Sequence, residues 1–236
     1  MKLSRTPFLL FVSLFALTWL CACSESPVAP ATNRQSGAAA GSSFATAPPD
    51  RPGLGTKWGE TRHSVSGLTS FVRATPARPL AAAEIFYNDR DGLEAMAATS
   101  VFRRIWPIIS GPTASLISIG LKDQSGRFLP GLIVGDRWFV VGEEGRRYAI
   151  VVKNRADLRL EIVLSVDGLD VLDGRPASVR KRGYVVEPHR TLTVDGFRQS
   201  AENVAAFRFS PVRESYAQEK YRNARNVGVI GVAIFN

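Results

Sequence analysis

The first hydrophobic segment of the chain is short and follows a basic start. Lys2 and Arg5 precede an uncharged, mostly apolar run at residues 7–20. This run of about 14 residues is shorter than the roughly 20 that a helix needs to span hydrocarbon, and no basic stop-transfer flank follows it. The pattern is typical of a secretory signal peptide, which we place at residues 1–22.

From residue 113 onward, short apolar runs alternate with Gly, Asp and Asn. Apolar and polar residues alternate at 158–166, which is the period of a strand with one buried face. Residues 227–235 are apolar at both alternating sets of positions, so we expect this strand in the middle of a sheet. Further strands are expected at 115–121, 128–134, 137–141, 148–153, 183–186, 191–194 and 204–209.

These runs predict the fold class. About nine short strands joined by turn residues predict a mainly β domain at residues 113–236. We expect an antiparallel β-sandwich, of which the jelly roll is one form. A proline after Ser210 marks the start of a short helix late in this domain.

The stretch at residues 53–112 is less regular. A short strand is expected at 85–87, and a capping box of Asp91 and Glu94 predicts a helix that stops before Pro107. We therefore expect an irregular α+β segment that packs on the main domain. Its sequence leaves open whether it forms a separate unit or adds strands and a helix to the sandwich.

Residues 23–52 differ from the rest of the chain in composition. They are rich in Ala, Ser, Pro and Gly and carry almost no bulky apolar side chains. Such a segment cannot bury enough apolar surface to offset the entropy of ordering. We expect a disordered tether with a root-mean-square reach of about 30 Å.

The junction between the signal peptide and the tether carries a motif. Leu20-Cys21-Ala22-Cys23 resembles the lipobox of bacterial lipoproteins, although Cys21 stands where a small or aliphatic residue is usual. The resemblance implies acyl chains such as palmitate on Cys23 and a membrane anchor. Ser24 is not the aspartate associated with retention in the inner membrane, so the resemblance favours the periplasmic face of the outer membrane. An ordinary signal cleaved near Ala22 would instead give a secreted or cell-surface protein.

Charge and cysteine content narrow the function classes. Loss of Lys2 and Arg5 with the signal peptide lowers the net charge from +9 to +7 and leaves Cys23 as the one thiol, so the mature chain has no internal disulfide. Arginines outnumber lysines, and the guanidinium fork binds phosphate and carboxylate in two places at once. Solvated surface charge is the alternative explanation. The candidate anion-binding cluster is Arg180, Lys181 and Arg182.

The compartment suggests which anions could bind. For an exported lipoprotein we expect anionic lipid, lipopolysaccharide or peptidoglycan as partners, and no nucleic acid. A protein partner is not indicated by any motif.

Three aspartates form the densest acidic segment. Asp167, Asp170 and Asp173 lie close to two glycines and are weak candidates for calcium ligands. Their spacing of three differs from the alternate spacing of an EF-hand loop, and Asp-Gly is also common turn chemistry. The sequence predicts no other cofactor and no other metal site.

No residue pattern assigns a catalytic centre. His63 and His189 are the two histidines, and no Gly-x-Ser-x-Gly elbow occurs. Trp58, Trp106, Trp138 and Phe197 are more typical of a core than of a sugar-stacking platform. Carboxylate pairs for glycoside hydrolysis could come from Glu143, Glu144, Asp167, Asp170, Asp195 and Glu202.

The sequence therefore favours a lipid-anchored envelope protein with a binding or structural role, which could recognise an anionic envelope component through its arginine-rich surface. The alternative hypothesis is an envelope hydrolase that acts on glycan or lipid through acidic residues of the sandwich. No catalytic residue is assigned, and a non-enzymatic role is the expectation.

Overall fold

The computed structural model describes residues 53–97, 103–105, 115–134 and 136–236. The chain divides into two compact units, Met1–Ala45 and Thr46–Asn236, and all described residues belong to the second. The predicted signal peptide, Cys23 and the predicted tether lie outside the described residues. No helix in the described ranges is both long enough and apolar enough to cross a membrane.

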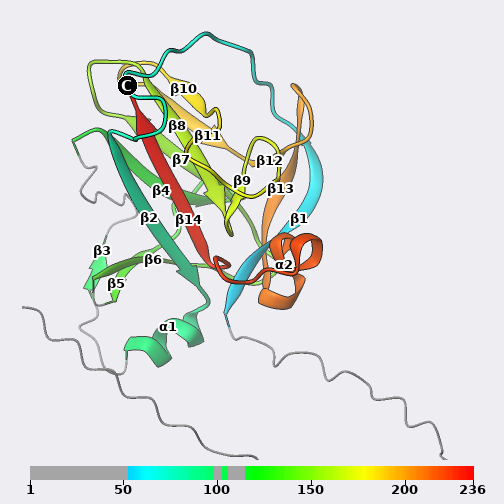
Figure 1. Cartoon of the computed structure of the whole chain (residues 1–236). Helices are drawn as coiled ribbons and strands as arrows, with labels where there is room; N and C mark the ends of the chain where they lie inside the picture. The colour runs from blue at the N-terminus through cyan, green and yellow to red at the C-terminus, as the bar shows by residue number, and fades with distance from the viewer. Residues whose placement is uncertain (1–52, 98–102, 106–114, 135) are drawn as a thin grey trace, which may run out of the picture. The chain divides into compact units, whose positions relative to one another are not determined.

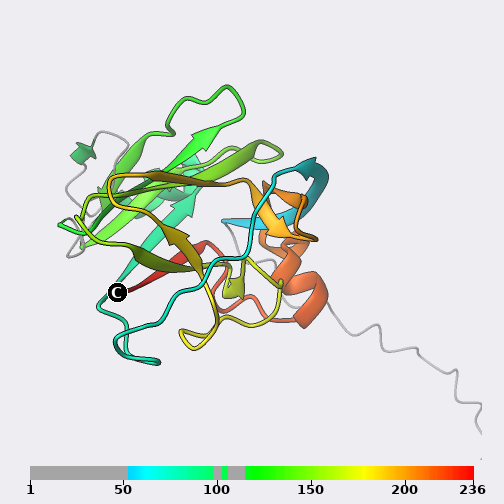
Figure 2. The same ribbon diagram turned by 90° about the horizontal axis from the view of Figure 1, so that it is seen from above.

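The described chain is mainly β and forms a sandwich of two sheets (Figures 1 and 2), as the sequence predicted. The first sheet is antiparallel, and its order runs from β1 through β13 and β7 to β11, with β4 beside β7 and β12 beside β13. Its strands are β1 (Leu54–His63), β4 (Ile117–Asp123), β7 (Arg147–Asn154), β11 (Thr191–Val194), β12 (Gly196–Arg198) and β13 (Asn203–Pro211).

The second sheet is mixed. Its order is β10-β8-β14-β2-β6-β5-β3, with β9 beside β8, and the β2–β6 pair is parallel whereas the others are antiparallel. Its strands are β2 (Ala81–Asn88), β3 (Arg103–Ile105), β5 (Gly131–Val134), β6 (Arg137–Val141), β8 (Leu160–Val166), β9 (Leu169–Asp170), β10 (Tyr184–Val186) and β14 (Val229–Phe235).

The core lies between the sheets. Alternate residues of each strand point inward, so Ile150 of β7 and Phe207 of β13 meet Ile162 of β8 and Ile230 of β14 in one buried cluster. Aromatic rings fill much of it, and Tyr148 stacks on Phe209 with ring centroids 4.3 Å apart. Burial of these apolar side chains is the main stabilisation of the sandwich.

The prediction for residues 227–235 is confirmed, and the prediction for 158–166 is wrong in one respect. β14 lies between β8 and β2, in the middle of its sheet. β8, however, is buried on both faces, because Glu161 and Val163 of its second face are covered. The covering residues, Arg73 and Phe71, come from the segment between β1 and β2.

Residues 53–112 supply strands to both sheets. β1 pairs with β13 over most of its length, and β2 pairs with β14. The sequence did not indicate β1, because its outer half is polar and exposed and shows no apolar alternation. The short strand expected at 85–87 is part of β2.

Two helices and one 3-10 turn complete the described chain: α1 (Arg90–Ala97), η1 (Val212–Glu214) and α2 (Tyr216–Tyr221). Asp89 caps α1 by accepting the amide hydrogen of Gly92 at 2.7 Å, so the predicted role of Asp91 in a capping box is wrong. The late helix begins beyond Pro211, because η1 intervenes and the hydroxyl of Ser215 caps α2.

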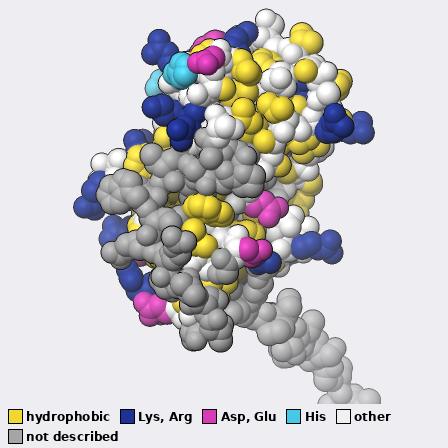
Figure 3. Space-filling view, turned by 90° about the vertical axis from the view of Figure 1, so that its left-hand side faces the viewer, with side chains coloured by type: hydrophobic (Ala, Val, Ile, Leu, Met, Phe, Trp, Pro, Cys, Tyr) yellow, Lys and Arg dark blue, Asp and Glu magenta, His cyan; other side chains and the backbone are white. Residues whose placement is uncertain are grey.

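Basic side chains are distributed over the surface. Figure 3 shows Lys and Arg around the margins of one face and hydrophobic side chains over its upper part. A site that binds an anion would therefore need several of these basic side chains to lie close together.

Candidate functional site

A groove opens in the first sheet because two of its central strands diverge. β7 and β13 pair only at Arg147 with Arg208 and at Tyr148 with Phe207. Beyond these pairs, β7 bonds to β11 and β13 bonds to β12. The backbone carbonyl of Asp195, which lies between β11 and β12, accepts a hydrogen bond from the amide of Phe207 at 3.1 Å. The β11–β12 segment therefore lies between β7 and β13 where these two strands separate.

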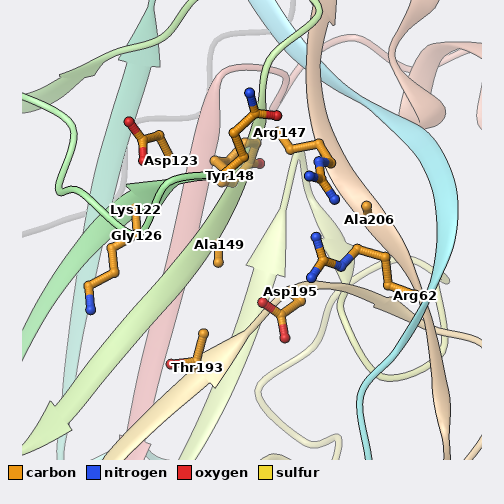
Figure 4. Close-up of a pocket in the computed structure, with 11 residues that line it drawn as sticks. Arg62, Lys122, Asp123, Gly126, Arg147, Tyr148, Ala149, Thr193, Asp195 and Ala206 are labelled. Carbon is orange, nitrogen blue, oxygen red and sulfur yellow. The ribbon is translucent and has the colours of Figure 1, made fainter.

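The groove has a volume of about 230 Å³, and Figure 4 shows its lining. Tyr148 points into the core, so strand alternation places its neighbours Arg147 and Ala149 on the outer face. Small residues leave space between the charged side chains. The lining residues are Arg62, Lys122, Asp123, Gln124, Gly126, Arg147, Tyr148, Ala149, Thr193, Asp195 and Ala206.

Glu60 of β1 holds two arginines at one side of the groove. Its carboxylate contacts Arg147 Nη1 at 3.1 Å and Arg208 Nη2 at 2.6 Å. Desolvation opposes ionisation of Glu60, but the hydrogen bond from Arg208 and the charges of both arginines outweigh it and hold its pKa below the ordinary value. Glu60 is therefore ionised at neutral pH and offsets part of the positive charge here.

Two further cations, Arg62 and Lys122, line the groove. Among the described residues, no carboxylate lies within ion-pair distance of Arg62 or Lys122. The ammonium of Lys122 lies 4.8 Å from the ring centroid of Phe128, which leaves its hydrogen-bond donors available. Arg62 is exposed and points into the groove from β1 (Figure 4).

Two carboxylates also line the groove. Asp123 accepts hydrogen bonds from Ser125 and from the amide of Arg127, and these lower its pKa below the ordinary value. Asp195, from the segment between β11 and β12, also lines the groove (Figure 4). The groove thus combines guanidinium and ammonium donors with carboxylate and hydroxyl acceptors, since Thr193 also lines it.

The arginine cluster predicted from the sequence lies elsewhere and is divided among different contacts. Lys181 binds Asp173, with Nζ 2.8 Å from Oδ1. Arg182 donates to the carbonyl of Phe71 at 3.2 Å. Arg180 is exposed and lines a small hollow together with Arg182.

Asp167 occupies a structural position in the core. Its Oδ1 accepts hydrogen bonds from the hydroxyl of Tyr87 and from the amide of Gly228, the latter at 2.9 Å, and its Oδ2 accepts the amide hydrogen of Thr56 at 2.7 Å. Burial raises the pKa of Tyr87 and of Tyr148 well above the ordinary value, and the charge of Asp167 adds to both shifts. The carboxylate therefore joins β1, β2 and the residue that precedes β14.

The other two weak candidates for calcium ligands, Asp170 and Asp173, bind backbone amides of the segment that follows β9. Asp170 Oδ1 accepts the amide hydrogens of Leu172 and Asp173, at 2.9 and 3.2 Å. Asp173 accepts the amide of Arg175 and binds Lys181. Within the described ranges, no group of three or more His, Cys, Asp or Glu side chains is arranged to hold a metal ion.

The remaining candidates are dispersed. Among the six carboxylates considered for hydrolysis, Asp195 is the one that lines the groove. His63 ends β1, and His189 binds Asp157 at 2.8 Å on the surface.

The aromatic candidates differ in exposure. Phe197 is buried, Trp138 packs against the core, Trp58 is 37% exposed, and Trp106 lies outside the described residues.

Sequence reasoning missed the groove. Arg62, Lys122 and Arg147 are separated by at least 25 residues from one another, and each alone resembles ordinary surface charge. The pair Arg146-Arg147 was the one local indication.

The chain has no match among protein-family models, among curated proteins or among solved structures.

Proposed function

We propose that this protein is a lipid-anchored binding protein of the cell envelope, and that the groove between β7 and β13 binds an acidic sugar group, one that carries a carboxylate or phosphate beside hydroxyls. The carrying observation is that Arg62 and Lys122 both line the groove and have no ion-pair partner among the described residues. Such donors bind carboxylate and phosphate oxygens strongly.

The acceptors define the ligand class more closely. A simple inorganic anion would be repelled by Asp195, which lines the groove, and a fully ionised anion has no hydrogen to donate to its carboxylate. Sugar hydroxyls donate hydrogen bonds to such oxygens. A volume of about 230 Å³ is below the 300–1,000 Å³ typical of pockets for drug-sized ligands. We therefore expect the groove to hold one sugar ring, free or at the end of a longer glycan.

The lipid anchor is part of the proposal and comes from the lipobox-like motif at Cys23. It would hold the domain at the outer membrane, where acidic glycans and phosphorylated lipid sugars are available. Mass spectrometry of the mature chain tests the anchor by itself. A mass equal to the unmodified polypeptide would contradict it.

The groove supports binding better than hydrolysis. A glycosidase needs one of its two carboxyl groups protonated at working pH, to act as the general acid. Hydrogen bonds keep the pKa of Asp123 below the ordinary value, so it is ionised at neutral pH. Asp123 therefore does not supply the protonated carboxyl group that a general acid requires.

Calorimetric titration tests the proposal. The mature chain with Cys23→Ser would be titrated with glucuronate, glucose 6-phosphate and glucose as probes. We expect the two acidic sugars to bind and glucose to bind at least tenfold more weakly. Arg62→Gln and Lys122→Gln should each lower the affinity for acidic sugars by about tenfold, since a charge-assisted hydrogen bond contributes about 1.5–3 kcal/mol.

A matched control separates the groove from general surface charge. Arg225 is exposed and lines none of the cavities described here. Arg225→Gln makes the same change in net charge and should leave affinity unchanged. Equal weakening by Arg225→Gln and Arg62→Gln would reject the groove as the site.

A further inference from the structure

The segment that joins β1 to β2, residues 64–80, crosses from one sheet to the other and is called the strap here. It has no regular secondary structure. At its start, the amides of Ser64 and Ser66 donate to the carbonyls of Glu202 and Ala201 beside β13. At its end, the amide of Leu80 donates to Ile234 of β14. The strap therefore closes one end of the sandwich, near the C-terminus (Figures 1 and 2).

Two arginines hold the middle of the strap: Arg73, which belongs to it, and Arg159, which precedes β8. Arg73 Nε lies 2.6 Å from Glu161 Oε2, and its guanidinium carbon lies 3.7 Å from the ring centroid of Phe235. Arg159 donates to the hydroxyl of Thr69 at 3.3 Å. These contacts fix the path of the strap across the sandwich. The outward side chains of the strap therefore keep fixed positions relative to one another.

Exposed apolar side chains concentrate on the strap and on the loops bonded to it. Among the described residues, six of eight large exposed hydrophobic side chains are found there, and Leu68 of the strap is fully exposed. Hydrophobic side chains also gather on the upper part of the face in Figure 3. The six are Val65, Leu68, Val72, Leu80, Leu158 and Val179. Such clustering on an exported domain marks a contact surface.

Guanidinium groups accompany this apolar surface. A hollow of about 320 Å³ beside the strap is lined by Phe71, Val72 and Pro76 together with Arg180 and Arg182. Among the described residues, neither Arg180 nor Arg182 has a carboxylate within ion-pair distance. Apolar tips next to unpaired guanidiniums match the two layers of a membrane surface, acyl chains beneath anionic headgroups.

We propose that the strap and the hollow beside it dock on an anionic phospholipid bilayer, with Leu68 and Val72 entering the acyl boundary and Arg180 and Arg182 binding headgroup phosphates. For its placement in the cell this inference rests on the proposed anchor at Cys23. The vesicle experiments below omit the anchor, so the two can fail separately.

The chain length permits this orientation. The described chain enters the sandwich at the other end, where the amide of Leu54 donates to Asn88 at the end of β2. The eight residues of β2 separate that end from the strap by roughly 25 Å. The 30 residues from Cys23 to Gly53 can extend to about 100 Å. An anchored chain can therefore bring the strap to the same bilayer.

Site-specific fluorescence tests the docking. In the mature chain with Cys23→Ser no other cysteine remains, so Leu68→Cys and, at the opposite end, Arg225→Cys can each carry an environment-sensitive dye. Vesicles of phosphatidylglycerol and phosphatidylethanolamine should shift the emission to the blue at position 68 and leave it unchanged at position 225. Bound protein with no shift at position 68 would overturn the proposal.

Substitutions then separate the apolar and the charged contributions. Leu68→Ser with Val72→Ser should lower the partition coefficient by at least about tenfold, and Arg180→Ser with Arg182→Ser by about fivefold for each arginine. Phosphatidylcholine vesicles should show no effect of the arginine pair. Leu68, Val72, Arg180 and Arg182 are exposed. Thermal unfolding of the variants should therefore stay near that of the parent, which confirms folding.

Two further outcomes decide against the proposal. If Leu68→Ser with Val72→Ser abolishes self-association in sedimentation experiments and leaves vesicle binding unchanged, the strap is an interface between two copies. If Arg62→Gln lowers vesicle binding as much as the Arg180 and Arg182 pair does, binding reflects net charge. Retained vesicle binding by Arg62→Gln alongside lost sugar binding supports both proposals as separate sites.

Discussion

Arg73 of the strap and Glu161 of β8 form a buried ion pair, with side chains 9% and 2% exposed and 2.6 Å between Nε and Oε2. The second Glu161 oxygen accepts the amide hydrogen of Gly183 at 2.7 Å, which places the carboxylate between three parts of the chain. Arg73 also donates to carbonyls of the segment that contains Val179 and Lys181. This pair connects an irregular segment to the sheet beneath it.

Removal of one partner should be costly. Arg73→Met leaves the Glu161 carboxylate buried without its cation, and such a change costs about 3–5 kcal/mol. Urea unfolding of the variant should therefore show a much lower free energy of unfolding. Arg73→Met combined with Glu161→Leu should recover a large part of the loss, since no unpaired charge remains.

The exposed pair of Arg90 and Glu94 provides the control. Both side chains are more than 60% exposed, and a solvated i,i+4 pair contributes about 0.3–0.5 kcal/mol. Arg90→Met should thus change stability little. Equal losses at Arg90 and Arg73 would contradict the assigned role of burial.

Asp167 should be intolerant even of an isosteric change. All three described partners donate hydrogen to its carboxylate: the amides of Thr56 and Gly228 and the hydroxyl of Tyr87. Asp167→Asn keeps the shape and tolerates the positive φ of 55°, but its amide nitrogen would face a donor. We expect a loss of about 3 kcal/mol in chemical unfolding. Asp157→Asn, at a side chain 97% exposed, should lose less than about 1 kcal/mol.

Asp170 should give the stability a distinct pH dependence. Burial raises its pKa above the ordinary value of 3.8, so from about that pH upward the native state keeps a proton that the unfolded chain has released. The contribution of Asp170 to the free energy of unfolding therefore decreases as pH rises through this range.

Asp170→Asn removes this titration and retains an oxygen to accept the amides of Leu172 and Asp173. Relative to the parent chain, the variant should gain stability between pH 3.5 and pH 7. Parallel unfolding curves over this range, with a constant difference between the two proteins, would contradict the raised pKa.

Substitutions of Glu60 and of Asp195 should have opposite effects on the affinity for acidic sugars. Glu60→Gln releases Arg147 and Arg208 from ion pairs of 3.1 and 2.6 Å, so acidic sugars should bind about fivefold more tightly, by one freed charge-assisted contact. Asp195→Asn should lower the affinity for a sugar, because the sugar donates hydroxyl hydrogens to the carboxylate. The same substitution should raise the affinity for inorganic phosphate, because it removes a repelling charge. Titration with both probes therefore identifies the ligand class.

Local patterns predicted most of the sandwich and little of the candidate site. The apolar run at 227–235 identified a central strand because burial on both faces leaves a direct record in the sequence. β1 left no such record, since its outer half is exposed, and its place beside β13 depends on pairing with residues about 150 positions later. The α2 start was misplaced because Pro211 suits the first turn of a helix as well as the 3-10 turn that it precedes.

The sequence by itself determined the mainly β sandwich, and it led to the expectation of an exported, anchored protein whose mature chain has no internal disulfide. These follow from periodicity, composition and a short motif, which are local properties. Only the tertiary structure decided which charges act together: it paired Lys181 with Asp173, left Arg180 and Arg182 beside one hollow, placed Asp167 in the core, and brought Arg62, Lys122 and Arg147 to one groove. The physical reason is that a strand's own residues specify its buried face, whereas the register and divergence of paired strands specify which exposed residues become neighbours.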